Sequence, residues 1–164
     1  MRKYARIWFL SLSTLALITG AACTRRTYAT GDGSVTVQRK GKDASTMKFT
    51  GRDGKQVSID MNAGAVPSDY PKDAPVYKDA KVVMAQSTSE KNGRHLMLET
   101  SDSATKIVEF YKKELEANGW KTDASMDMGA MSMITANKGN RQIVVQVIGD
   151  NDKRSINQTL SDKD

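Results

Sequence analysis

Apolar residues alternate with polar ones over residues 34–62 of this 164-residue sequence, and a later segment shows helical spacing instead. Val57, Ile59 and Met61 illustrate the alternation, which places every second side chain on the same face of a β-strand. The segment with helical spacing has four apolar residues along one side: Ile107, Val108, Tyr111 and Leu115. The pattern predicts an α+β fold in which one helix covers an antiparallel sheet.

The clearest signals lie in residues 77–161, which we expect to form the main α+β domain. A hairpin should turn at the K-N-G sequence of residues 91–93. Ser103 can cap the helix that follows, and the N-G pair at 118–119 can stop it. Three or four further strands are expected after the helix, which gives a ββαβββ-like order.

Two shorter regions precede this domain. Residues 34–62 alternate over three short runs with glycines between them, which predicts a small β-meander. Residues 63–76 contain all three prolines of the chain, which favours an extended connector because proline disrupts helices and central strands. Residues 23–33 are short and polar, and we expect them to act as a tether.

The N-terminus has the layout of an export signal. Arg2, Lys3 and Arg6 precede an apolar run over residues 7–18, and small residues follow. The run has twelve residues, whereas a permanent membrane-spanning helix needs roughly twenty. Residues 1–22 are therefore expected to form a cleaved signal peptide.

Small residues at 20–22 precede Cys23, which is the single cysteine of the chain. This arrangement resembles the lipobox of bacterial lipoproteins. The resemblance implies cleavage before Cys23, a diacylglycerol on its sulfur and an acylated amino terminus, with no other cofactor. Several acyl chains hold a protein on a membrane almost permanently. The same small residues also suit a simple cleaved signal peptide, in which Cys23 would be an ordinary thiol.

The lipoprotein resemblance also implies a location. Thr24 follows the cysteine, and in Gram-negative lipoproteins a residue other than aspartate there implies sorting to the outer membrane, facing the periplasm. In other bacteria the anchor would lie on the outer face of the cell membrane.

Basic residues gather in the predicted meander, although the chain after residue 22 has a net charge of only about +3. They form either a surface for an anionic envelope polymer or a solvated sheet face that discourages edge pairing. Nucleic acid is not an expected partner, because no aromatic residues interleave these charges. The candidate binding residues are Arg39, Lys40, Lys48, Arg52 and Lys55.

Four methionines lie within eight positions near the predicted strands after the helix. Thioether sulfur binds soft ions such as Cu(I) and Ag(I), so this cluster is a candidate metal site. Methionine is also a common filler of irregular core space, and we favour inward packing under the helix on a hairpin that turns near residues 129–130. The four residues are Met126, Met128, Met131 and Met133.

No catalytic set of residues can be assembled from the sequence. His95 is the single histidine, and the alternation of the strand places it on the same face as Glu99 but too far for a direct bond. We therefore expect the protein not to be an enzyme.

The chain after residue 23 resembles an uncharacterised family of exported bacterial lipoprotein domains. Three segments carry the likeness: V-P-S-D-Y-P-K-D-A-P-V-Y-K-D-A-K-V at 66–82, L-E-T-S-D-S at 98–103 and F-Y-K-K-E-L at 110–115, followed by G-W at 119–120. The resemblance implies no activity. We expect a membrane-anchored envelope lipoprotein that binds an envelope protein or an anionic polymer, with a periplasmic Cu(I) or Ag(I) binding protein as the alternative.

Overall fold

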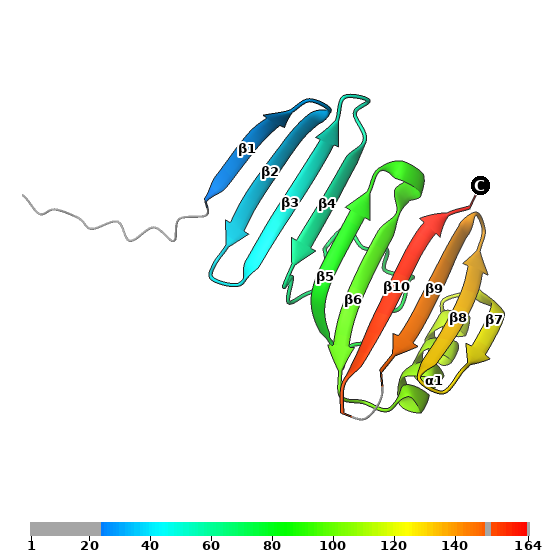
Figure 1. The fold of residues 1–164 in the computed structure, drawn as a ribbon. Coiled ribbons are helices and arrows are strands. Elements are labelled where there is room, and N and C mark those ends of the chain that lie inside the picture. The colour runs from blue at the N-terminus through cyan, green and yellow to red at the C-terminus, as the bar shows by residue number, and fades with distance from the viewer. Residues whose placement is uncertain (1–23, 150–151, 164) are drawn as a thin grey trace, which may run out of the picture.

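The computed structural model describes residues 24–149 and 152–163, and the described residues form one antiparallel sheet of ten strands with a single α-helix on one face (Figure 1). The strands neighbour one another in the order β1-β2-β3-β4-β5-β6-β10-β9-β8-β7. Their bounds are β1 Arg25–Thr30, β2 Gly33–Lys40, β3 Ala44–Gly51, β4 Gln56–Met61, β5 Lys81–Thr88, β6 Arg94–Thr100, β7 Lys121–Asp127, β8 Met131–Lys138, β9 Arg141–Ile148 and β10 Arg154–Asp162.

The α-helix α1 (Ala104–Ala117) begins and ends where the sequence predicts. The Ser103 side chain accepts a hydrogen bond from the backbone N–H of Lys106, which satisfies one of the first-turn donors. Gly119 has a φ of +79°, a left-handed conformation that glycine adopts without the penalty of a Cβ atom. The chain then turns back, and the backbone N–H of Trp120 donates to the carbonyl of Leu115.

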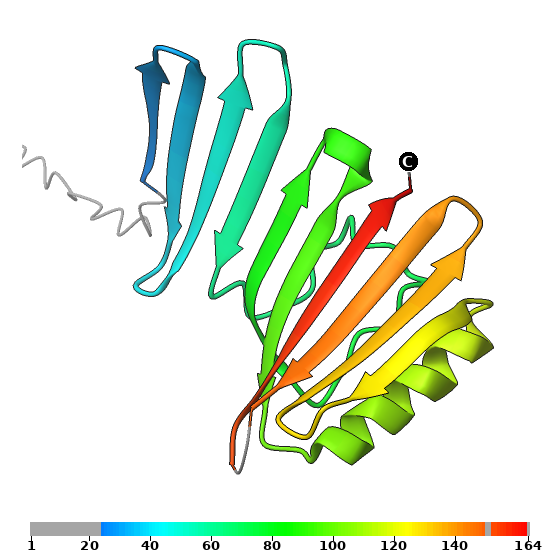
Figure 2. The same cartoon turned by 45° about the vertical axis from the view of Figure 1, so that its right-hand side comes forward.

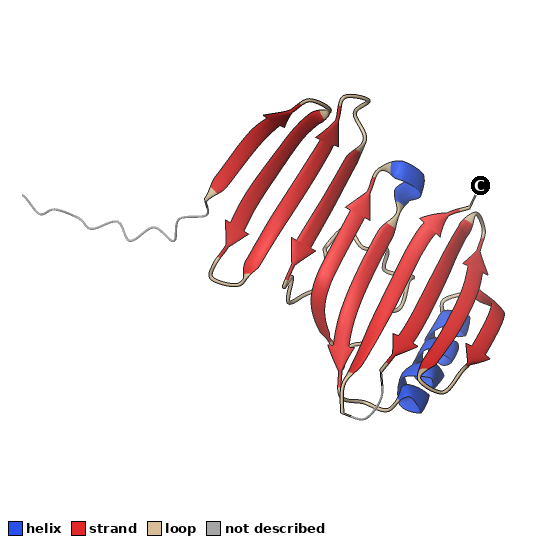
Figure 3. Ribbon diagram, in the orientation of Figure 1, coloured by secondary structure: helices blue, strands red, loops and turns tan. Residues whose placement is uncertain are grey.

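The predicted α+β class and its order of elements are confirmed: two strands, the helix and four strands follow one another from β5 to β10 (Figure 3). After β6 the chain passes through α1 to the far edge of the sheet and returns strand by strand. The last strand, β10, therefore lies between β6 and β9 in the middle of the covered region. A short 3₁₀ turn (Glu90–Asn92) joins β5 to β6.

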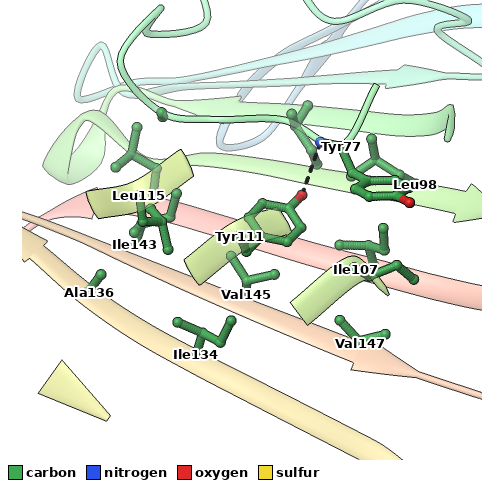
Figure 4. Packing of buried hydrophobic residues seen from close by; sticks show 14 of the residues in the cluster. Tyr77, Leu98, Ile107, Tyr111, Leu115, Ile134, Ala136, Ile143, Val145 and Val147 are labelled. Atoms are coloured by element: carbon green, nitrogen blue, oxygen red, sulfur yellow. Dashed lines mark hydrogen bonds between the residues drawn. The ribbon is translucent and has the colours of Figure 1, made fainter. Parts of the chain in front are cut away.

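The buried core lies between α1 and the sheet (Figure 4). Ile107, Tyr111 and Leu115 are fully buried on one side of the helix, as the spacing predicts. They pack against alternating residues of β8 and β9, such as Ile134 and Val145. Burying a large aliphatic side chain contributes about 1.5–3 kcal/mol, so this contact stabilises the domain substantially.

Residues 63–76 are more than the connector that the sequence predicts. Tyr70 and Ala74 are buried in the same core as α1, and the segment runs across the same face of the sheet (Figure 2). The indole N–H of Trp120 donates to the carbonyl oxygen of Asp73 at 2.6 Å. Proline excludes regular structure here but does not prevent burial, which the prediction missed.

Gln158 is the polar centre of this core. Its side chain is fully buried on β10, and its amide oxygen accepts a hydrogen bond from the hydroxyl of Tyr111 at 2.8 Å. Its amide nitrogen donates to the hydroxyl of Tyr70 at 2.7 Å and to the carbonyl of Pro75 at 2.9 Å. One residue thus joins the sheet, the helix and the segment before β5.

The predicted meander is present as β2, β3 and β4, and it continues directly into the main sheet because β4 pairs with β5. The prediction of a tether over residues 23–33 is wrong for β1 (Arg25–Thr30), which pairs with β2 along its whole length. The sequence of β1, R-R-T-Y-A-T, lacks the apolar alternation that would have revealed a strand, and every residue of β1 is exposed.

Replacing Gln158 by leucine should lower the free energy of unfolding by about 3 kcal/mol, because three buried polar groups lose their partner. Urea unfolding measures this change. Gln146→Leu is the matched control: Gln146 is half-buried on the uncovered face, with a weak contact to the Met133 sulfur at 3.9 Å, and should cost less than about 0.5 kcal/mol. Equal effects of the two variants would contradict the role given to Gln158.

Candidate functional site

The two faces of strands β1–β4 differ sharply in character. Asp60 on β4 lies opposite buried Ala85, so it faces the side of the sheet that carries α1, and its neighbours Ile59 and Met61 face the other side. Strand register extends this second face across β3, β2 and β1. We call its apolar residues the apolar patch: Tyr28, Val35, Val37, Met47, Phe49, Val57 and Ile59.

The apolar patch is continuous because its members are cross-strand neighbours. Tyr28, Val35, Phe49 and Val57 stand in register across the four strands. Val37, Met47 and Ile59 form a second row beside them. Directly opposed side chains on one face of an antiparallel pair are about 5 Å apart, close enough for contact.

No described segment covers the apolar patch. Among the described residues, the buried core contains no member of β1–β4, and α1 contacts β7, β8 and β9 (Figure 2). Tyr28 remains 52% exposed and Phe49 38%. By contrast, the uncovered face of β6, β9 and β10 is largely polar, with residues such as Gln146, Asn157 and Thr159, as expected for a face in contact with water.

Two arginines are the charged residues on the apolar face of the described strands β1–β4. Arg26 stands opposite Val37, and Arg39 lies two residues beyond Val37 on the same face. Together with Thr24 and Tyr28 they line a shallow hollow of about 300 Å³ at the N-terminal corner of the sheet. Cys23 and the predicted signal peptide, residues 1–22, lie outside the described residues, but the sequence places Cys23 two residues before β1.

The five predicted basic residues do not form one surface. Arg39 faces the side of the apolar patch, whereas Lys40 and Lys48 face the opposite side. Arg52 and Lys55 lie in the turn between β3 and β4. Acidic residues partly balance the charges: the Lys40 amine is 3.7 Å from Asp60, and the Lys55 amine is 3.7 Å from Asp53 and 3.8 Å from Glu90.

Lys48 does belong to a polar groove on the helix side of the sheet. It stands in register with Ser58 and Ser87, and this row ends at Arg94 on β6. The groove has a volume of about 360 Å³. The guanidinium of Arg94 is 3.5 Å from Asp69, so this charge is also partly balanced.

The methionine hairpin does turn at residues 129–130, but the expected inward packing is wrong. Met126 is 45% exposed and Met128 57%, and Met131 and Met133 face the uncovered side of β8. Ser132, Ile134 and Ala136 are the buried residues of that strand. Both alternating sets on β8 contain apolar residues, so the sequence pattern alone did not decide which set faces the helix.

The most perturbed ionisable groups hold the fold together. Asp73 accepts hydrogen bonds from Arg141 and Lys138, with a shortest distance of 2.6 Å to each. The contact with Arg141 is the main reason that the pKa of Asp73 lies well below its usual range. Arg141 also stands over the ring of Trp120, with 5.1 Å from its guanidinium carbon to the ring centroid.

The hydroxyl of Tyr77 donates to Asp102 at 2.6 Å, and Lys106 pairs with the same carboxylate at 3.0 Å. Burial, with the nearby carboxylate, raises the pKa of Tyr77, so its phenol is protonated at neutral pH. Nδ1 of His95 lies 3.0 Å from the hydroxyl of Thr159, and Glu99 pairs with Lys153 instead of with the histidine.

Comparison with known proteins covers only part of the chain. Residues 81–155, from the start of β5 to the start of β10, match the model of a family described as START domain-like. No curated protein and no solved structure matches the sequence. The matched region excludes β1–β4 and the apolar patch. Within the described ranges, no helix is long and apolar enough to cross a membrane.

Replacing Asp73 by asparagine should lower the free energy of unfolding at pH 7 by about 1–2 kcal/mol, since the ion pairs are partly exposed. A carboxyl group whose pKa is depressed in the folded state stabilises the fold at pH values above its unfolded pKa of about 3.9. This contribution to the free energy of unfolding is lost as the pH falls toward the folded pKa. The stability gap between wild type and variant should therefore narrow from pH 5 to pH 2.

Urea unfolding across this pH range measures the gap. Asp53→Asn is the control, because Asp53 and Lys55 are both more than half exposed and their pair should contribute little. A gap that stays constant with pH would contradict the role given to Asp73.

Proposed function

We propose that this protein is a non-catalytic envelope lipoprotein, held on the membrane by lipid on Cys23, whose apolar patch binds another envelope protein. The N-terminal sequence supports the anchor, with its short apolar run and its single cysteine after small residues. Cys23 and Thr24 together span at most about 7 Å before β1 begins. The edge of the sheet would therefore stand next to the membrane surface.

The apolar patch is the observation on which the binding role rests. A strand face rich in apolar residues requires a second layer, and β1–β4 lack one among the described residues. Large exposed apolar patches on proteins mark interaction surfaces. A protein that exposed this face permanently to water would be prone to aggregate.

The composition of this face favours a protein as the occupant. Protein interfaces are enriched in tyrosine, phenylalanine, methionine and arginine, and their centres are poor in lysine and acidic residues. Tyr28, Met47 and Phe49 lie on the face, with Arg26 and Arg39 at its border. Among the described residues of β1–β4, none that points to this side is lysine, aspartate or glutamate.

An anionic polymer fits less well. Binding of such a polymer requires several cations that face the same way. The basic residues of the meander are instead divided between both faces and a turn, and acidic groups lie beside Lys40 and Lys55. The observations therefore favour an apolar protein surface over a charged polymer.

Intact mass of the protein extracted from membranes of its native host tests the anchor. We expect residues 1–22 to be absent and the mass to exceed that of the 23–164 chain by a diacylglycerol and an acyl group. A Cys23→Ser variant should lose the added mass and leave the membrane fraction. A mature wild-type chain without lipid would contradict the anchor but would leave the apolar patch in place.

Photo-crosslinking from two adjacent positions tests the binding face. A benzophenone amino acid replaces Phe49 on the apolar patch or, as the matched control, Lys48, which is also exposed but points to the opposite side. After irradiation of cells, we expect protein adducts from position 49 and at least fivefold fewer from position 48.

Three results would contradict the proposal: adducts to lipid alone, an adduct to a second copy of this chain alone, or equal yields from both positions. The first would indicate a bilayer as the occupant and the second a homodimer.

A further inference from the structure

Three methionines meet on neighbouring strands beyond the end of the apolar patch. Met61 on β4 lies opposite Met84 on β5, and Met84 lies opposite Met97 on β6. We call these three residues the methionine row. Directly opposed residues have Cα atoms about 4.5–5.5 Å apart and side chains on the same face, so three flexible thioethers can converge.

A β-bulge places Met84 in this row. The pairing of β5 with β6 shifts between Val82, which faces Leu98, and Met84, which faces Met97, so Val83 is the extra residue. Without the bulge Met84 would lie opposite Leu96 and point into the core. Bulges often reorient a side chain at functional sites.

Backbone groups just after the end of β4 hold the bulge of β5 in place. The N–H of Asn62 donates to the carbonyl of Val83 at 2.7 Å, and the N–H of Gly64 donates to the carbonyl of Val82 at 3.1 Å. Asn62 has a φ of +49°, in the left-handed region that asparagine tolerates better than most residues. The position of Met84 is therefore fixed by hydrogen bonds in the fold.

His95 lies on the same face as the methionine row. It precedes Met97 by two residues on β6, a separation of about 7 Å along a strand. Its side chain is half-buried. When Nδ1–H donates to Thr159, the lone pair of Nε2 is available to a metal ion.

We propose that Met61, Met84, Met97 and His95 form a binding site for a soft monovalent cation, Cu(I) or Ag(I). Thioether and imidazole ligands suit Cu(I), and methionine needs no deprotonation before it binds. Within residues 24–149 and 152–163, no group of three or more His, Cys, Asp or Glu residues could hold a metal ion. This site uses neither the lipid anchor nor any residue of the apolar patch.

The methionines of the hairpin provide a comparison within the same chain. Met126 and Met133 face each other across β7 and β8, and both are separated from the methionine row by β9 and β10. Gln146 and Asn157 occupy the intervening positions of the same register. Met128 and Met131 form a second opposed pair beside the turn. Met126 and Met128 are largely exposed at the outer edge of the sheet and no imidazole lies beside the hairpin, so it should bind a soft ion more weakly.

Anaerobic titration of the chain 24–164, which contains every described strand, tests the site. Cu(I) is supplied as its acetonitrile complex in competition with bicinchoninate, a coloured Cu(I) chelator. The row variant Met61→Leu, Met84→Leu and Met97→Leu should bind at least 100-fold more weakly than wild type. His95→Gln should weaken binding at least fivefold.

The control is a hairpin variant in which Met126, Met128, Met131 and Met133 become leucine, and its affinity should stay within twofold of wild type. Leucine preserves apolar volume, and melting temperatures within about 3 °C would show that each variant is folded. In methyl NMR with Ag(I), the three row signals should shift most.

Three results would overturn the site: no Cu(I) uptake by wild type, unchanged affinity in the row variant, or an equal or larger loss in the hairpin variant. Because these experiments use neither membrane nor partner, they can fail while the proposed function holds.

Discussion

A helix of 14 residues is about 21 Å long, whereas ten strands spaced about 4.8 Å apart form a sheet about 43 Å wide. The helix α1 and the segment before β5 therefore cover only part of one face of this sheet. Under them, residues of β5, β6, β8, β9 and β10 are buried, and Gln158 joins the layers. Strands β1–β4 extend beyond this cover, and their stability depends on backbone pairing and cross-strand contacts.

Because the cover is unequal, the apolar residues on the two halves of the sheet point to opposite faces and have different roles. On β6, β9 and β10 most large apolar residues point toward the cover, and the opposite face is largely polar. On β1–β4 the apolar residues point away from the covered side. The meander thus has the pattern of a sandwich half whose second layer is missing from the described chain, which is the physical basis for a binding role.

The sequence predicted the elements with strong local signals. The helix was located by its spacing and by the cap at Ser103, and the hairpins by their glycine turns. Three features had no local signal. Strand β1 has few apolar residues, the packing of Tyr70 depends on contact with distant Gln158, and the methionine row depends on a one-residue bulge. Each is decided by long-range contacts or by strand register, which the alternation of side chains does not specify.

Hydroxyl-radical labelling gives the most direct test that the apolar patch is covered in the envelope. Labelling rates are compared between the protein in native membranes and the purified protein. Phe49 and Tyr28 should be labelled at least fivefold more slowly in membranes, whereas Met126, exposed to a similar extent on the far edge of the sheet, should react equally in both. If Phe49 and Tyr28, like Met126, were labelled at the same rate in membranes as in the purified protein, the patch would be exposed in the cell. That result would contradict the account.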